Sequence, residues 1–173
     1  MKQLFWGLFI TAIIFATAGS IEAKKKANKK KAKIEKTAGT TDLESKVVGK
    51  HMLSLQWISW KYFGSVTITK EADGTFTCKG EQLARNCKDA DDDCITNDDY
   101  LKLDGKIQIV DEKHLVFTGQ IRTKIYHINK GQELLREGTF NFEATGNRKF
   151  WRMQEMDNPA DGCIDYIDIY FKR

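Results

Sequence analysis

Apolar and polar residues alternate along much of the chain after residue 50, with the period of two that marks β-strands. In residues 114–127 the apolar residues Leu115, Phe117 and Ile121 fall at alternate positions, and Gly119 belongs to the same set. Short runs of this kind, rich in β-branched and aromatic residues, recur to the end of the chain. No stretch after residue 50 shows a helical period, so the pattern predicts an all-β domain.

Turn signals such as Asp73-Gly74 separate the runs and indicate sequential hairpins. The runs predict strands at 53–60, 64–70, 75–82, 99–103, 106–111, 114–127, 134–144, 148–155 and 163–171. Antiparallel strands joined in order favour an up-and-down barrel of about eight strands, because closure leaves no exposed edge. A two-sheet β-sandwich fits the same pattern and is the alternative.

The N-terminal segment has the parts of a secretory signal peptide, namely Lys2, an apolar run over residues 4–15, and the small residues Ala16 and Ala18. The run is shorter than the roughly 20 residues of a membrane-spanning helix. We therefore predict that residues 1–18 are removed and that the protein is exported, to the periplasm or beyond the cell. Lysines follow closely, so an uncleaved helix that tethers the chain to the membrane is the alternative.

Charge divides the remaining chain into two parts. Residues 19–50 carry ten lysines against four acidic residues, and only one apolar side chain in residues 24–36 is larger than alanine. We predict a disordered basic leader at 19–50, which acts either as a solvated spacer or, through residues 24–36, as a tether to an anionic envelope surface. Residues 51–173, the predicted barrel domain, carry 17 basic and 20 acidic residues, so no nucleic-acid partner is expected for the barrel.

Four cysteines in an exported chain suggest disulfides. Cys87 and Cys94 share one polar loop, and a bond between them would clip it. Cys78 would then join Cys163, linking an early strand to the last one. Four cysteines allow three connectivities, and all three stay open at this point.

Several segments resemble a family of small exported bacterial proteins with a lipocalin-like barrel, also described as calycin-like. The segments are LQWISW (55–60), DGTFTCKGEQ (73–82), GTFNF (138–142), GNRKFWRMQ (146–154) and DYIDIYF (165–171). The resemblance covers most of residues 50–171 and implies the compartment and the fold, but it brings no activity. The chain departs from the family pattern where that pattern has cysteines, at Leu134 or Leu135 and at Ala160.

A small closed barrel holds either a packed core or a cavity for one ligand. We predict a cavity, and with it a non-catalytic binding protein for a small apolar or amphipathic molecule. The expected lining is Trp57, Phe117, Ile121, Phe140, Phe142, Trp151 and Arg152. Strand parity allows only one of Trp151 and Arg152 to face inward, and ordinary core packing is the alternative for the phenylalanines.

One acidic loop suggests a metal. Asp89, Asp91 and Asp93 match the first half of a calcium-binding loop. The match ends there, because Cys94 and Tyr100 stand where the loop needs glycine and glutamate. A solvated acidic loop is therefore the alternative to calcium, and no other cofactor is expected.

A second acidic cluster lies near the C-terminus, and a pair of its carboxylates could hydrolyse a glycosidic bond. The cluster comprises Glu155, Asp157, Asp161, Asp165 and Asp168. No nucleophile, phosphate-binding or metalloprotease motif accompanies it. We therefore predict that the protein is not an enzyme.

Overall fold

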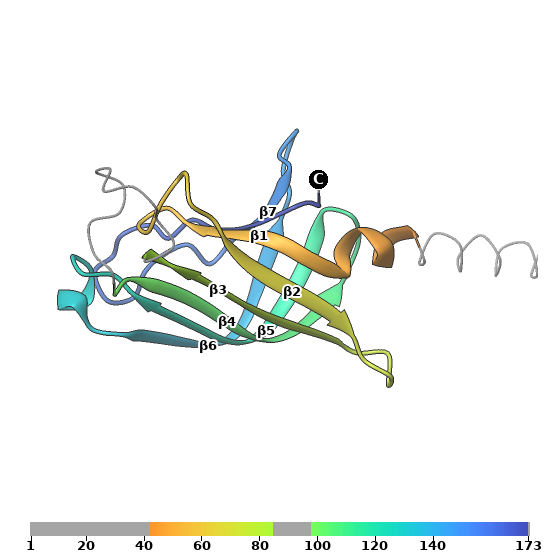
Figure 1. Cartoon of the computed structure of the whole chain (residues 1–173), viewed down its shortest axis with the longest axis horizontal. Coiled ribbons are helices and arrows are strands. Elements are labelled where there is room, and N and C mark those ends of the chain that lie inside the picture. Colours follow the sequence, from red (N-terminus) through yellow and green to blue (C-terminus); the bar gives the residue numbers. More distant parts are fainter. Residues whose placement is uncertain (1–41, 85–97, 173) are drawn as a thin grey trace, which may run out of the picture. The chain divides into compact units, whose positions relative to one another are not determined.

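The computed structural model describes residues 42–84 and 98–172 and shows a barrel of eight antiparallel strands (Figure 1). The strands are β1 (Gly49–Leu55), β2 (Gly64–Lys70), β3 (Phe76–Leu83), β4 (Tyr100–Ile109), β5 (His114–Lys124), β6 (Leu134–Glu143), β7 (Phe150–Met153) and β8 (Ile167–Tyr170). Each strand pairs with the next along the chain, and β1 pairs with β8, which closes the barrel. The predicted up-and-down barrel is confirmed, and the sandwich alternative is excluded.

Some element boundaries differ from the prediction. The runs 99–103 and 106–111 form a single strand, β4, because Gly105 pairs with Gly119 and continues the ladder. β1 begins at Gly49, and residues 42–47 form a short helix before it. Regular structure thus begins within the segment predicted as leader, 19–50. No helix in the described part of the chain is long and apolar enough to cross a membrane.

A row of three glycines crosses the sheet, because Gly119 pairs with Gly105 on β4 and with Gly138 on β6. A Cβ atom on Gly119 would lie 2.5 Å from the Cα atom of Gly105 and 2.4 Å from the carbonyl oxygen of Asp104. Real Cβ atoms do not approach other atoms this closely. Glycine at this position therefore lets β4 and β5 lie closer together than side chains would allow.

Apolar side chains from all eight strands fill the barrel interior. Each strand has at least one residue with an exposed fraction of zero, for example Leu53, Ile68, Cys78, Leu101, Phe117, Phe142, Met153 and Ile169. Alternate residues on the same strands face outward and are mostly polar on β2 to β6, as at Thr67, Lys79, Lys102 and Thr118. The period of two that the sequence shows is thus the inward and outward alternation of a barrel wall.

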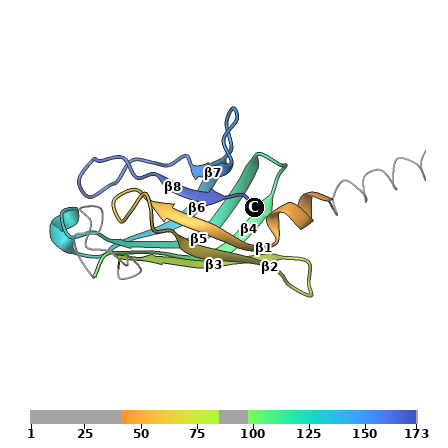
Figure 2. The same cartoon turned by 45° about the horizontal axis from the view of Figure 1, so that its top comes forward.

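The two ends of the barrel are built differently, as Figures 1 and 2 show. At one end, here called the loop end, segments 56–63, 125–133 and 154–166 connect the strands, and a short 3-10 helix, η2 (Asn129–Gly131), lies in the second. At the other end, the helix end, residues 42–47 lie near the tight turns and the C-terminal segment. Longer irregular segments commonly carry binding residues, so the loop end is a candidate location for a binding site.

Candidate functional site

Four of the predicted lining residues lie in the middle of the packed core. Phe117, Ile121 and Phe142 are fully buried, and Phe140 is almost so. The ring of Phe117 lies 6.2 Å from that of Phe140 and 6.4 Å from that of Phe142, which are normal packing distances for aromatic side chains. The structure brings these residues together, and they pack as core residues do.

The structure resolves which of the two adjacent β7 residues faces inward. Trp151 is 2% exposed and points into the barrel, where its Nε1 donates to the carbonyl oxygen of Glu112 at 3.1 Å. Arg152 lies on the outer face, where its Nε and Nη2 each donate to the Asp168 carboxylate at 2.7 Å. Its guanidinium also stacks 4.1 Å from the centre of the Tyr166 ring. A protein carboxylate therefore satisfies Arg152, and its hydrogen bonds raise the pKa of that guanidinium.

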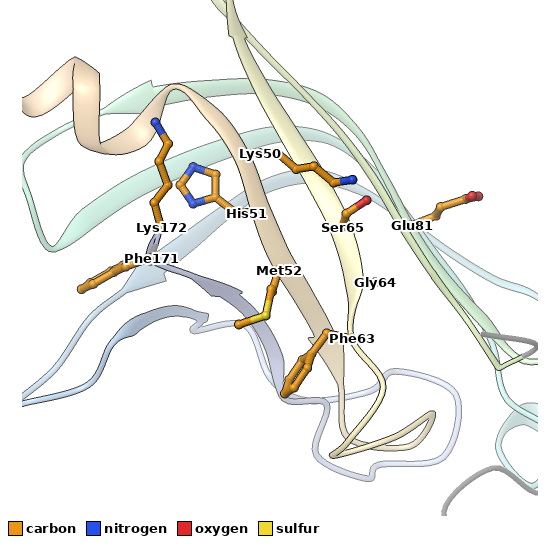
Figure 3. A pocket seen from close by; sticks show the side chains of 9 residues that line it. All are labelled: Lys50, His51, Met52, Phe63, Gly64, Ser65, Glu81, Phe171 and Lys172. Carbon is orange, nitrogen blue, oxygen red and sulfur yellow. The ribbon is translucent and has the colours of Figure 1, made fainter. Parts of the chain in front are cut away.

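A pocket of about 470 Å³ lies against the outer face of β1 and β2 (Figure 3). Its lining combines apolar, basic and acidic side chains, among them Lys50, Met52, Phe63, Glu81, Phe171 and Lys172. In Figure 3 Met52 and Phe63 point to one side of the pocket and Lys50 to the other. The pocket is thus amphipathic, and its volume lies within the range of small-molecule sites, about 300–1,000 Å³.

A second hollow of about 330 Å³ adjoins the first and shares Phe171 and Lys172 with it. It lies between the helix of residues 42–47 and the barrel end, and Leu43, Val47 and Trp151 give it a largely apolar lining. Lys172 Nζ donates to the carbonyl oxygens of Ser45, at 2.8 Å, and Val48. The C-terminal segment is thereby fastened to the helix, beside both hollows.

His51 makes a second link between the helix and the barrel. The side chain is 3% exposed, with Nε2 2.7 Å from the carbonyl oxygen of Val47 and Nδ1 2.9 Å from that of Tyr170. Its ring also meets Trp151 edge to face at 5.8 Å. The wall behind the outer pocket is therefore held by a buried imidazole that lies between the helix and β8.

A buried polar cluster occupies the loop end, beyond the apolar core. Trp57 Nε1 donates to Asp165 Oδ1 at 2.9 Å, and Asn158 Nδ2 donates to Asp165 Oδ2 at 3.0 Å. Arg136 approaches the same carboxylate, with Nη1 3.7 Å from Oδ2. Trp57 thus packs against the edge of the core at the barrel mouth, whereas the four residues with which it was predicted to form one lining lie within the core.

Burial perturbs both charged members of this cluster. Desolvation raises the pKa of the Asp165 carboxyl, against the opposing effects of its hydrogen bonds from Trp57 and Asn158 and of the Arg136 charge. Desolvation also lowers the pKa of the Arg136 guanidinium, although Asp165 and two other carboxylates oppose that change. Charged groups are seldom buried without a reason in packing or function.

Sequence reasoning missed Arg136. Its position could have been found, because it lies two and four residues before Gly138 and Phe140 and therefore shares their inward phase on β6. The inward phase of Arg136 is hard to recognise because the strand begins with an irregular mixture of apolar and charged residues. Lys50 and Lys172 carried no signal at all in the sequence, since lysine is common on surfaces.

The acidic cluster near the C-terminus does not form a shared pair among the described residues. Asp165 and Asp168 bind different partners, Trp57 and Arg152. Glu155 accepts from the backbone amide of Asn141, and Asp161 from that of Asn129. Within residues 42–84 and 98–172, no three His, Cys, Asp or Glu side chains gather to hold a metal ion.

The structure describes two of the four cysteines for which disulfides were predicted, Cys78 and Cys163. Cys78 and Cys163 are free thiols, so the predicted bond between them is not present. Cys78 is fully buried in the barrel interior, whereas Cys163 lies in the loop before β8 and is only partly buried. Burial raises the pKa of Cys78 to about 12. Cys87, Cys94 and the calcium candidates Asp89, Asp91 and Asp93 lie outside the described residues.

The fold and the pockets define a small, closed, antiparallel β-barrel protein with an amphipathic hollow on its wall and a buried ion pair at its mouth. The chain belongs to the PM1083 family, whose model matches residues 24–171. It is 43% identical over 129 residues to the uncharacterised protein PM1083 of Pasteurella multocida (strain Pm70), covering 75% of this chain and 76% of that protein. No solved structure matches the chain.

Proposed function

We propose that this protein is an exported, non-catalytic binding protein that holds a small amphipathic molecule with an anionic group in the outer pocket of Figure 3. The observation that carries the proposal is the lining of this pocket. Met52, Phe63 and Phe171 offer an apolar surface, and Lys50 offers positive charge, to which Lys172 adds from the helix end. Among the described residues that line the pocket, Glu81 is the one acid. Such a combination suits a molecule with an apolar body and a negative end.

The neighbouring hollow supports the same ligand class. It shares Phe171 and Lys172 with the outer pocket and is largely apolar, so a ligand tail can extend into it from the charged end. Trp151, which the sequence pattern predicted to line a ligand site, contributes to this hollow. The proposed site therefore lies at the barrel wall and helix end, whereas the interior phenylalanines serve as core.

Titration calorimetry with dodecanoate, compared with uncharged dodecanol, tests this proposal. We expect saturable binding of dodecanoate and weaker binding of the alcohol. Lys50→Gln should weaken dodecanoate binding about threefold to fivefold, the effect of losing one solvent-exposed ion pair. Lys79→Gln is the matched control, because Lys79 is an exposed lysine on the barrel wall that does not line the pocket and pairs with Asp104. Equal affinities in the two variants, or no binding by the wild type, would refute the proposal.

A second candidate function rests on the leader. Ten lysines in residues 19–50 favour attachment to an anionic envelope surface. We expect binding to phosphatidylglycerol vesicles that weakens with salt and is lost when residues 19–41 are deleted. The deletion stops at residue 41 because residues 42–47 form the helix that lines the second hollow. Binding that survives the deletion would place the interaction on the barrel instead.

A further inference from the structure

The buried imidazole of His51 lies between two hydrogen-bond acceptors. Its Nε2 is 2.7 Å from the carbonyl oxygen of Val47, and its Nδ1 is 2.9 Å from that of Tyr170. A carbonyl oxygen only accepts hydrogen bonds, and a neutral imidazole carries a proton on one of its two nitrogens. The neutral ring can therefore donate to one of these oxygens, whereas the imidazolium, with a proton on each nitrogen, donates to both.

The carbonyl oxygens at the end of the helix of residues 42–47 favour positive charge. Lys172 Nζ donates to the carbonyl oxygens of Ser45 and Val48, and the His51 ring approaches that of Val47. Basic side chains commonly bond to the last carbonyl oxygens of a helix, where the backbone carries partial negative charge. A protonated His51 thus adds to the fastening that Lys172 already provides.

No carboxylate of the described residues pairs with His51. The acids on the neighbouring elements pair with other cations, Asp42 and Glu112 with Lys46, Glu44 with Lys70, and Asp168 with Arg152. Burial opposes a charge on the ring. Hydrogen bonds from an ionised donor are about twice as strong as neutral ones, and the imidazolium makes two of them where the neutral ring makes one. The two carbonyl oxygens are therefore the groups that favour the proton.

His51 also belongs to the proposed ligand site. It lines the outer pocket with Lys50, Glu81 and Lys172 (Figure 3), and its helix partner Val47 lines the second hollow. Lysine and glutamate side chains do not ordinarily titrate between about pH 6 and about pH 8, whereas histidine does. His51 is therefore the lining residue whose charge can change in this range.

We propose that protonation of His51 controls the affinity of the amphipathic site. The imidazolium donates to Val47 and Tyr170, which links the helix to β8 beside both hollows, and it places one more positive charge in the pocket wall. Loss of the proton removes that charge and one of the two links, so the affinity for an anionic amphipathic molecule falls as pH rises. The ligand part rests on the proposed function, whereas the proton-dependent link does not.

NMR of the ligand-free chain of residues 19–173 tests the link. The chain has three histidines, so His114→Gln and His127→Gln assign the ring signals of His51 by elimination. We expect both His51 ring nitrogens to carry a proton at about pH 6 and one of them to lose it by about pH 8. The two hydrogen bonds exist only in the folded protein, so the urea midpoint should fall over the same range, and less so in His51→Gln.

Calorimetry with dodecanesulfonate tests the ligand part, because its sulfonate stays ionised at both pH values. We expect the wild type to bind it about threefold to tenfold more tightly at about pH 6 than at about pH 8, within the limit of tenfold per pH unit for one proton. His51→Gln should bind equally at both, since a glutamine amide donates from one end only. His114→Gln is the control, because His114 is exposed, contacts Asp111 and does not line the pocket.

A His51 ring that is already neutral at about pH 6 in the folded wild type would overturn the proposal. Equal wild-type affinities at both pH values, or an unchanged pH dependence in His51→Gln, would do the same. If dodecanesulfonate binds at neither pH, the proposed function fails with the ligand part, and the NMR and urea measurements decide the link by themselves. The wild-type NMR titration remains decisive if His51→Gln does not fold.

Discussion

At the scale of single residues, the outer wall of β7 and β8 depends on one buried ion pair. Asp168 is 1% exposed, and its carboxylate accepts two hydrogen bonds from Arg152. The Arg152 guanidinium also packs against Tyr166 and Phe150. Geometry of this kind offsets the cost of removing both charges from water, so the two side chains depend on each other.

Replacing one member of the pair should expose this dependence. We expect Arg152→Met to lower the free energy of unfolding by about 3 kcal/mol, because it leaves a carboxylate buried without a partner. Urea unfolding followed by tryptophan fluorescence measures the change. The double variant Arg152→Met, Asp168→Leu should recover most of the lost free energy of unfolding. A single variant as stable as the wild type would show that the pair contributes little.

The thiol of Cys78 gives a second residue-scale prediction. Its pKa of about 12 and its complete burial leave almost no reactive thiolate in the folded protein. Under non-reducing conditions, peptide mapping should find Cys78 and Cys163 unbonded to each other. Alkylation of folded protein should modify Cys163 well before Cys78, and urea should remove the difference. A recovered peptide containing a Cys78–Cys163 bond would contradict the structure.

At the scale of the strands, the glycine row determines how closely β4 and β5 can approach. A methyl group at Gly119 would meet backbone atoms of Asp104 and Gly105. We expect Gly119→Ala to lower the free energy of unfolding by about 2–3 kcal/mol, the usual cost of overpacking. Gly74→Ala is the control, because nothing lies within 4 Å of its Cβ position and only its φ of +84° is unfavourable. Equal costs for the two variants would rule out close approach as the reason for glycine at 119.

The strands were more predictable than the site. Alternation in residues 114–127 predicts which side chains of β5 face the barrel interior, because a period of two is visible within a short stretch of sequence. The merging of two predicted runs into β4 was not predictable, since Gly105 reads as a turn until its partner Gly119 is known. Arg136 and Asp165 lie far apart in the sequence and meet only in the folded barrel, so no local pattern could pair them.

At the scale of the whole molecule, the helix of residues 42–47 is part of the barrel domain. Val47 has an exposed fraction of zero, and its carbonyl oxygen meets the buried ring of His51. A chain that begins at residue 42 should therefore unfold at the same urea concentration as a chain that begins at residue 19. A chain that begins at residue 49 should have a free energy of unfolding about 1.5–3 kcal/mol lower, which is the contribution of burying one valine side chain. Identical midpoints for both truncations would mean that the helix contributes nothing to stability.

The pairing of β1 with β8 also bears on the order in which the barrel folds. Leu53 pairs with Ile169, so the bonds that complete the barrel join the two extremes of the folded domain. Ordering a long loop costs entropy before such contacts can form, whereas the hairpins from β2 to β6 form between neighbours. Closure should therefore be the last step of folding, and a ribosome must release nearly the whole chain before the barrel can exist.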